Sequence, residues 1–308
     1  MKQNLWFHKY VLKFLQASSA IAILFTSAIA LADPPGATFS QDKSGHPLTT
    51  QIICDANSTI YKGCPDLSRD FAGDGWQLKF TDDFNSSSVD NSKWSRCYFW
   101  GTPNGCTNGS AGDLQWFAPD DVLVEDGILR LRAQKRQSNG KQYTSGMIAS
   151  HDKFSFKYGY IEMRAKIPNG NGFWSDFWLL SQNKKWPPEL DIAEFVGSNT
   201  TNVHMSLHYD DGSGHQNSTG WWGEKEDMDF SLDYHTYAVQ WEPDKIVWYV
   251  DGVERRLYTG KGIPQDPMYL VAILAVGAAW GLPPDSSTPF PSTFDIDYIK
   301  VWQRNSTK

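Results

Sequence analysis

The sequence predicts an all-β protein, a β-sandwich jelly roll of two antiparallel sheets, and three observations support this fold class. Short stretches rich in Val, Ile, Tyr, Phe and Trp recur from Trp76 onward, separated by turn residues. Two of these stretches contain the Asp-Gly signal of a tight hairpin, at residues 126–127 and 251–252. No amphipathic helical pattern longer than about three turns and no internal repeat interrupts them.

The expected strands follow one another at the spacing of a sandwich or jelly roll. They lie within residues 76–84, 121–134, 143–150, 156–168, 172–181, 189–197, 202–209, 235–258, 268–276 and 294–303. We expect a single domain over residues 73–304, because about 230 residues is a normal size for this fold class. Residues 305–308 are then a C-terminal tail.

The N-terminus has the pattern of a signal peptide. Lys2, Lys9 and Lys13 precede an uncharged run, residues 17–32, that ends in Ala-Leu-Ala. A membrane anchor is the alternative, but this run of about sixteen residues is shorter than the roughly twenty that a bilayer requires. We expect cleavage after Ala32, an extended N-terminal arm over residues 33–72, and a protein that is secreted, or periplasmic in a Gram-negative cell. No later segment is apolar enough to span a membrane.

Four cysteines are an even number, which fits disulfides in an oxidising compartment. Pairing of sequence neighbours, Cys54 with Cys64 and Cys97 with Cys106, is favoured because each pair brackets a short loop. A zinc site is the alternative, but the sequence has no CxxC motif to support it.

The net charge of −7 and the lack of a basic stripe argue against nucleic acid or an anionic membrane as partner. A neutral or cationic ligand fits better, and we expect a monomer. Fourteen Trp residues are more than packing alone requires, and aromatic faces pair well with the C–H faces of sugar rings.

The segment ELDIAEF, residues 189–195, contains three carboxylates in six residues. On a strand, Glu189 and Asp191 share one face. Strict alternation would place Ala193 beside them and bury Glu194 on the other side. A one-residue β-bulge at Ile192 or Ala193 brings all three acids to one face, and such bulges are over-represented next to active sites.

Aligned carboxylates repel one another, so their alignment calls for a functional explanation. A single acid here could simply be solvated. Hydrolysis of a glycosidic bond, however, needs one ionised carboxyl to attack the anomeric carbon and one protonated carboxyl for the leaving oxygen. Repulsion from the other acids is expected to raise the pKa of that proton donor. With the bulge, the Cα atoms of Glu189 and Glu194 are roughly 13 Å apart, and their side chains must lean together to meet the roughly 5 Å of a retaining enzyme.

ELDIAEF resembles the ExDxxE signature of glycoside hydrolase family 16, in the bulged form of its laminarinase-like branch. Other segments resemble the family in the same order, from FTDDFN at residues 80–85, through DLQWF, YTSGMIAS, the GxWxxFW segment and HMSLHY, to the C-terminal FDIDYIKVW. The resemblance implies a jelly roll with a concave substrate cleft. It also implies an endo-acting retaining β-glucanase that needs no cofactor for catalysis, with β-1,3- or mixed β-1,3-1,4-glucan as substrate.

The resemblance assigns roles to individual residues. Glu189 matches the nucleophile, Glu194 the general acid/base, and Asp191 the residue that orients the nucleophile. His208 matches a family histidine near the acid/base. The expected substrate-binding residues are Trp174, Trp178, His208, Arg164, Trp186 and Trp116. The resemblance also implies a structural calcium, with Asp83, Gly127 and Asp297 at the matching positions.

Two departures from the family affect the substrate rather than the acids. Ser175 and Asp176 replace the usual Pro and Ala of the Trp segment, and residues 273–281 read ILAVGAAWG where the family often has NLAVGG. We expect neither departure to touch the acids. A cell-wall transglycosylase uses the same acids and remains an alternative, as does a hydrolase of agar or carrageenan. The sulfated galactans are disfavoured because they call for Arg and Lys clusters. A non-catalytic binding module would not need three aligned acids.

Overall fold

The computed structural model describes residues 75–223 and 228–305, and the following statements concern those residues. The expected signal peptide (1–32), the arm (33–72), the Cys54–Cys64 pair and all but Asn305 of the tail lie outside them.

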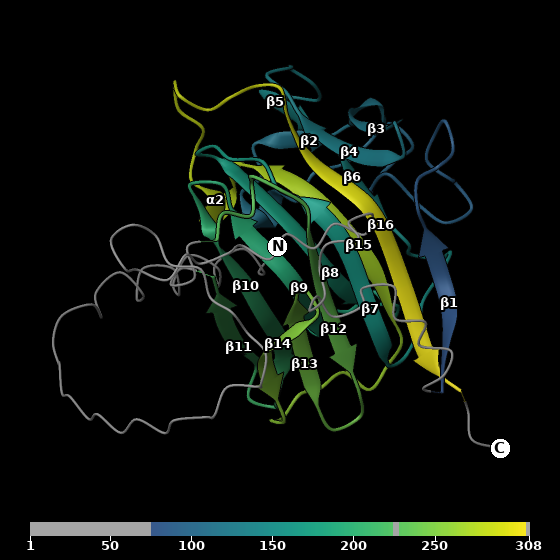
Figure 1. Ribbon diagram of the computed structural model, residues 1–308. Coiled ribbons are helices and arrows are strands. Elements are labelled where there is room, and N and C mark those ends of the chain that lie inside the picture. Colours follow the sequence, from purple (N-terminus) through teal and green to yellow (C-terminus); the bar gives the residue numbers. More distant parts are fainter. Residues whose placement is uncertain (1–74, 224–227, 306–308) are drawn as a thin grey trace, which may run out of the picture. The chain divides into compact units, whose positions relative to one another are not determined.

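Two antiparallel sheets and a small parallel pair make up the described domain (Figure 1). The 8-stranded sheet has the order β14-β13-β12-β7-β16-β4-β3, with β1 paired to β16, and the 6-stranded sheet has the order β11-β10-β9-β8-β15-β6. The strands of the first sheet are β1 (Trp76–Asp82), β3 (Val122–Glu125), β4 (Ile128–Ala133), β7 (Gly159–Lys166), β12 (His235–Trp241), β13 (Ile246–Val250), β14 (Val253–Tyr258) and β16 (Ser292–Arg304). Those of the second are β6 (Met147–Ala149), β8 (Phe173–Ser181), β9 (Glu189–Val196), β10 (Asn199–Asp210), β11 (His215–Trp222) and β15 (Met268–Val276). β2 (Gln115–Phe117) pairs with β5 (Tyr143–Ser145). The predicted all-β fold class is confirmed.

Helices are short throughout the described ranges. They comprise α2 (Ala278–Gly281) and the 3₁₀ turns η3 (Gly109–Ala111) and η4 (Pro119–Asp121). None of them has the length and apolar character needed to cross a membrane.

Both predicted Asp-Gly turns close hairpins. Asp126 and Gly127 connect β3 to β4 with φ of 55° and 74°, and Asp251 and Gly252 connect β13 to β14 with φ of 52° and 72°. Positive φ at both central residues matches the twist of antiparallel strands, and Asp-Gly adopts it at low cost.

The main core lies between the two sheets and follows the alternation of their strands. On β7, Ile161, Met163 and Ala165 belong to this core, as do Leu190 and Phe195 on β9. Burying each such large side chain contributes about 1.5–3 kcal/mol. On β7 the intervening residues Glu162 and Arg164 therefore point away from the core, to the outer face of their sheet.

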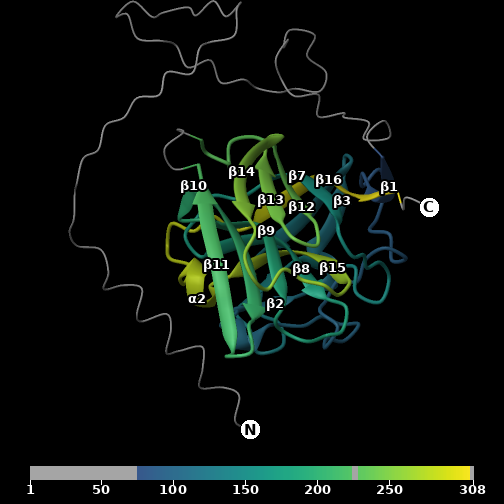
Figure 2. The ribbon, with the colours of Figure 1, turned by 90° about the horizontal axis from the view of Figure 1, so that it is seen from below.

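A second apolar cluster covers part of the outer face of the 6-stranded sheet. Tyr98 and Phe117, from the loop that precedes β2 and from β2 itself, pack there against Met147 of β6 and Tyr269 of β15. The predicted Cys97–Cys106 disulfide closes this loop. The other edge of this sheet, formed by β10 and β11, lies toward α2 in both views (Figure 1 and Figure 2). The loop and α2 thus flank the outer face of the central strands.

Candidate active site

The predicted β-bulge is present in β9. Against β8, Ala193 pairs with Phe177 and Asp191 with Trp178, which leaves Ile192 without a partner. The register against β10 shifts at the same place. Ile192 is therefore the extra residue, and both it and Ala193 belong to the core between the sheets.

A hydrogen bond from the opposite sheet supports the bulge. Trp248 of β13 is fully buried, and its indole Nε1 donates to the main-chain oxygen of Asp191 at 2.8 Å. A bulge leaves a ladder group unpaired, and a buried carbonyl needs a partner. Glu189, Asp191 and Glu194 consequently share the outer face of β9, which together with Asp176 of β8 we call the acidic face.

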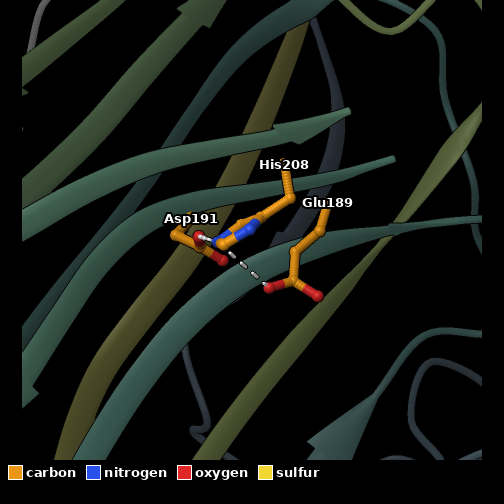
Figure 3. A group of neighbouring side chains, drawn as sticks. All are labelled: Glu189, Asp191 and His208. Atoms are coloured by element: carbon orange, nitrogen blue, oxygen red, sulfur yellow. Dashed lines mark ion pairs between the residues drawn. The ribbon is translucent and has the colours of Figure 1, made fainter. Parts of the chain in front are cut away.

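Glu189 is contacted by two side chains, Trp186 and His208, and Figure 3 shows His208 beside Glu189 and Asp191. Trp186 Nε1 donates to Glu189 Oε2 at 2.7 Å, and His208 Nε2 lies 3.7 Å from Glu189 Oε1. Burial and the charge of Asp191 raise the pKa of Glu189 to about 8, while His208 and the Trp186 hydrogen bond oppose that rise. Both contacts favour the carboxylate form, which a nucleophile requires.

His208 connects the acids to a second histidine. Its Nε2 lies 3.3 Å from Asp191 Oδ2, an ion-pair distance without hydrogen-bond alignment. Its Nδ1 lies 3.0 Å from His215 Nε2, so one imidazole donates and the other accepts. His208, which the resemblance places near the acid/base, pairs across the strands with Glu189, and its charge also acts on Glu194.

Glu194 lacks donors of comparable strength. Its side chain is 7% exposed, and Ser206 Oγ donates to its Oε2 at the long distance of 3.4 Å. Burial, followed by the charges of Asp191 and Glu189, raises the pKa of Glu194 well above its ordinary value. The two glutamates therefore differ in the direction expected of a nucleophile and an acid, because Glu189 has two neighbours that favour its charged form, whereas Glu194 has one long hydrogen bond.

Two neighbours of Glu194 were missed by the sequence analysis. Asp176 lies opposite it on β8, and His204 lies opposite it on β10. Asp176 is 4% exposed and pairs with Glu194 across the two strands, so the expectation that it does not touch the acids is wrong. Burial lowers the pKa of His204 to about 4, so this imidazole is neutral at pH 7, and it packs edge-on against Trp280.

Trp174, Trp178 and Trp186 lie on or beside the acidic face, whereas Trp116 lies on β2. Trp186 contacts Glu189 directly, and Trp174 packs edge-on against Trp280 with ring centroids 5.7 Å apart. Trp178 is only 7% exposed and packs against Tyr98, and Trp116 donates its indole N–H to the carbonyl of Asn104. Sugar binding by these residues stays a prediction. Two hollows of about 440 Å³ each lie beside the disulfide loop and beside β1 rather than over the acids.

Arg164 does not belong to the acidic face. Its neighbours Met163 and Ala165 point into the core, so Arg164 lies on the outer face of the other sheet. There it binds Asp297 at 2.6 Å and stacks on Tyr234. The structure therefore places Arg164, which was predicted to bind substrate, away from the acidic face.

The proposed calcium ligands do not fit a calcium ion. The carboxylate of Asp297 is neutralised by Arg164, and Lys300 Nζ lies 3.4 Å from Asp83 Oδ1. Gly127 could contribute only its main-chain oxygen, since it has no side-chain ligand atom. Calcium binds a shell of oxygen atoms, and here a cation would face a guanidinium and an ammonium instead.

One acid–imidazole group in the described ranges is close enough to hold a metal ion. It comprises Glu189, Asp191 and His208, whose ligand atoms lie within 4.8 Å of one another. These are the residues that the bulge brings together on the acidic face, and the hydrolytic chemistry proposed below uses them without a metal.

Comparison with known proteins identifies the family. The family model described as glycosyl hydrolases family 16 matches residues 113–300. The chain belongs to glycosyl hydrolase family 16. The matched region contains β9, its bulge and all four carboxylates of the acidic face.

Individual relatives agree with this assignment. An endo-1,3-1,4-β-glycanase, ExsH, of Rhizobium meliloti is 33% identical over 72% of this chain and 51% of the relative. A β-glucanase of Rhodothermus marinus is 29% identical over 80% of this chain and 92% of the relative. The laminarinase catalytic domain of Thermotoga maritima has a TM-score of 0.67 and 31% identity, covering 74% of this chain and 98% of that domain. The chain spans about half the length of the Rhizobium relatives that it matches.

Replacing Trp186 with Phe is expected to raise the pKa of Glu189, because the substitution removes the indole donor and keeps an aromatic ring. The ascending limb of kcat/KM against pH should move to higher pH by about 1 unit, which corresponds to about 1.4 kcal/mol. The pH profiles of the variant and the parent measure this shift. Trp302→Phe, on the other sheet, is the matched control, and an unmoved limb in Trp186→Phe would contradict the assigned role of the hydrogen bond.

Proposed function

We propose that this family 16 protein is an endo-acting β-glucanase that hydrolyses β-1,3- or mixed β-1,3-1,4-glucan with retention of configuration. The observation that carries the proposal is the bulged strand β9, which presents Glu189, Asp191 and Glu194 on one face. The substrate class is supported by the relatives, which are named as 1,3-1,4-β-glycanases, β-glucanases and laminarinases.

The first step of the reaction transfers the sugar to the protein. The Glu189 carboxylate attacks the anomeric carbon while Glu194 donates its proton to the departing glycosidic oxygen. His208 favours the charge of Glu189, and Asp191, buried at 1% exposure, lies within ion-pair distance of His208 and keeps it beside Glu189. The chemistry uses side-chain carboxyls and needs no cofactor.

The second step releases the sugar. Glu194, now ionised, takes a proton from water, and the resulting hydroxide attacks the anomeric carbon and displaces Glu189. Two inversions leave the configuration of the product the same as that of the substrate. A sugar hydroxyl in place of water would give transglycosylation, the alternative outcome at the same site.

A substrate panel tests the proposal. We expect soluble oligosaccharides from laminarin, barley glucan or lichenan, and at least 100-fold lower kcat/KM on xyloglucan, agarose and carrageenan, about 2.7 kcal/mol of discrimination. Linkage analysis of the products identifies the bond that is cleaved. Chain-length redistribution without net release of reducing ends would indicate a transglycosylase, and release from agarose or carrageenan alone would overturn the glucan assignment.

The location and assembly of the protein belong to the same proposal. A basic N-terminus followed by the apolar run 17–32 favours export, and a polysaccharide too large to enter a cell is degraded outside it. We propose that the mature protein acts outside the cytoplasm as a monomer on β-glucan.

A further inference from the structure

Asp176 and Glu194 face each other across neighbouring strands. They are direct partners in the antiparallel β8–β9 register, and side chains at such positions have Cβ atoms about 4.5–5.5 Å apart. Both are nearly buried, at 4% and 7% exposure, on the same outer face of the sheet. Like charges in this arrangement are destabilising unless one carboxyl retains its proton.

The surroundings of Asp176 provide no compensating cation among the described residues. On β15, the other strand that neighbours β8, the residue paired with Asp176 is the apolar Ile273. The titratable groups that face this region are Glu189, Asp191 and Glu194 on β9, His204 and His208 on β10, and Tyr98 from the disulfide loop. Of the two histidines, His204 is neutral at pH 7 and His208 lies against Asp191 and Glu189.

One carboxyl oxygen of Asp176 receives no hydrogen bond from the described part of the chain and could therefore share a proton with a neighbouring carboxyl. Within residues 75–223 and 228–305, no hydrogen-bond donor reaches Asp176 Oδ1, although the atom is buried. Burial and the charge of Glu194 raise the pKa of Asp176 well above its ordinary value. A buried carboxylate oxygen normally has a partner, and the group placed opposite this one is a second carboxyl.

We propose that Asp176 is a positioning residue that shares one proton with Glu194 and so keeps the acid/base catalyst protonated at neutral pH. Two adjacent carboxyls that hold one proton release it only at a pH well above that of an isolated acid. The inference rests on the proposed hydrolase function and adds a fourth acid to its machinery.

The proton balance of the cycle follows from this pair. In the first step the shared proton moves from Glu194 to the leaving oxygen as the C–O bond breaks, which leaves the pair with two negative charges. The second charge makes Glu194 a stronger base. In the second step Glu194 takes a proton from water while the hydroxide bonds to the anomeric carbon, and the pair again holds one proton.

Asp176→Asn tests the proposal, because it removes the charge and keeps the shape of the side chain. The descending limb of kcat/KM against pH on β-glucan should move to lower pH by at least about 1 unit. At a pH above the midpoint of the variant's descending limb, the variant should be about 10-fold less active than the parent on the polysaccharide. On an aryl glycoside with a good leaving group, the two should differ less than about 3-fold. Asp176→Ala should shift the limb in the same direction.

Ser175→Ala is the matched control, since Ser175 is the buried neighbour of Asp176 on the same strand. Its pH profile should equal that of the parent. Superimposable pH profiles for Asp176→Asn and the parent would overturn the proposal. An equal loss of kcat/KM at every pH in a folded variant would also overturn it, because such a loss indicates a substrate contact instead. If Glu189→Ala and Glu194→Gln behave as described below, such a result removes only the role of Asp176 and leaves the hydrolase function in place.

Discussion

Replacing Glu189 with Ala is expected to lower kcat on β-glucan by on the order of 10⁴-fold or more, the size of effect seen when a catalytic residue is removed. The reason is geometric as well as chemical. Glu189 is the acid that accepts the short Trp186 hydrogen bond and lies beside His208, so it is the carboxylate prepared to carry charge. Without it, the acidic face retains a proton donor but no group that can bond to the anomeric carbon.

Azide should restore part of the activity of Glu189→Ala on an aryl β-glucoside substrate of suitable length. The small anion enters the space left by the side chain and attacks the anomeric carbon from the same side. The glycosyl azide that forms should have the α configuration, which NMR or chromatography against standards can establish. A β-configured azide would assign Glu189 to acid/base catalysis instead.

Glu254→Ala is a suitable control, because Glu254 is an exposed carboxylate on β14 of the other sheet. It should retain the activity of the parent with or without azide. Full activity of Glu189→Ala itself would remove this residue as the nucleophile and with it the proposed function.

The fold and the three central acids could be predicted because their signals are local. Alternation of apolar residues and the Asp-Gly turns predict strands and hairpins from a few neighbouring residues. The two-residue and three-residue gaps in Glu189, Asp191 and Glu194 predict the bulge for the same reason. Each of these predictions depends on chain distances of only a few residues.

Features that depend on pairing between distant strands could not be predicted in this way. The hydrogen bond from Trp248 to the bulge joins residues 57 positions apart. Asp176 meets Glu194 only through the β8–β9 register. Alternation on β8 already places Asp176 on one face with Trp174 and Trp178, but which residue of β9 lies opposite is decided by tertiary structure.

The positions of Arg164 and of the expected calcium ligands have a related cause. A family motif locates a residue on a strand. Which face of the sheet the side chain of that residue occupies follows from the burial of the adjacent residues on the same strand. Met163 and Ala165 are apolar and enter the core, so Arg164 must point outward. Its ion pair with Asp297 then occupies an acid that was expected to bind calcium.

Replacing Glu194 with Gln should separate proton donation from the rest of catalysis. General acid catalysis contributes about 10²–10⁴-fold, so kcat/KM on β-glucan should fall by that factor. On an aryl glycoside whose leaving group needs no proton, kcat/KM should fall by less than about 10-fold, although kcat should still drop because release of the sugar from Glu189 needs the base. Equal losses on both substrates would contradict the assignment of Glu194 as the acid.

The same variant should be more stable than the parent at alkaline pH. The folded protein raises the pKa of Glu194 above its value in the unfolded chain, so between these two values the folded state binds more protons, and stability falls as pH rises. Below the unfolded pKa, near 4.3, this cost is absent. Glu194→Gln should therefore raise Tm by a few degrees at pH 8, at about 2–4 °C per kcal/mol for a domain of this size, and by little at pH 4. A Tm gain that does not grow with pH would mean that Glu194 is not held in its protonated form by burial and its acidic neighbours, and the physical basis for its role as proton donor would be lost.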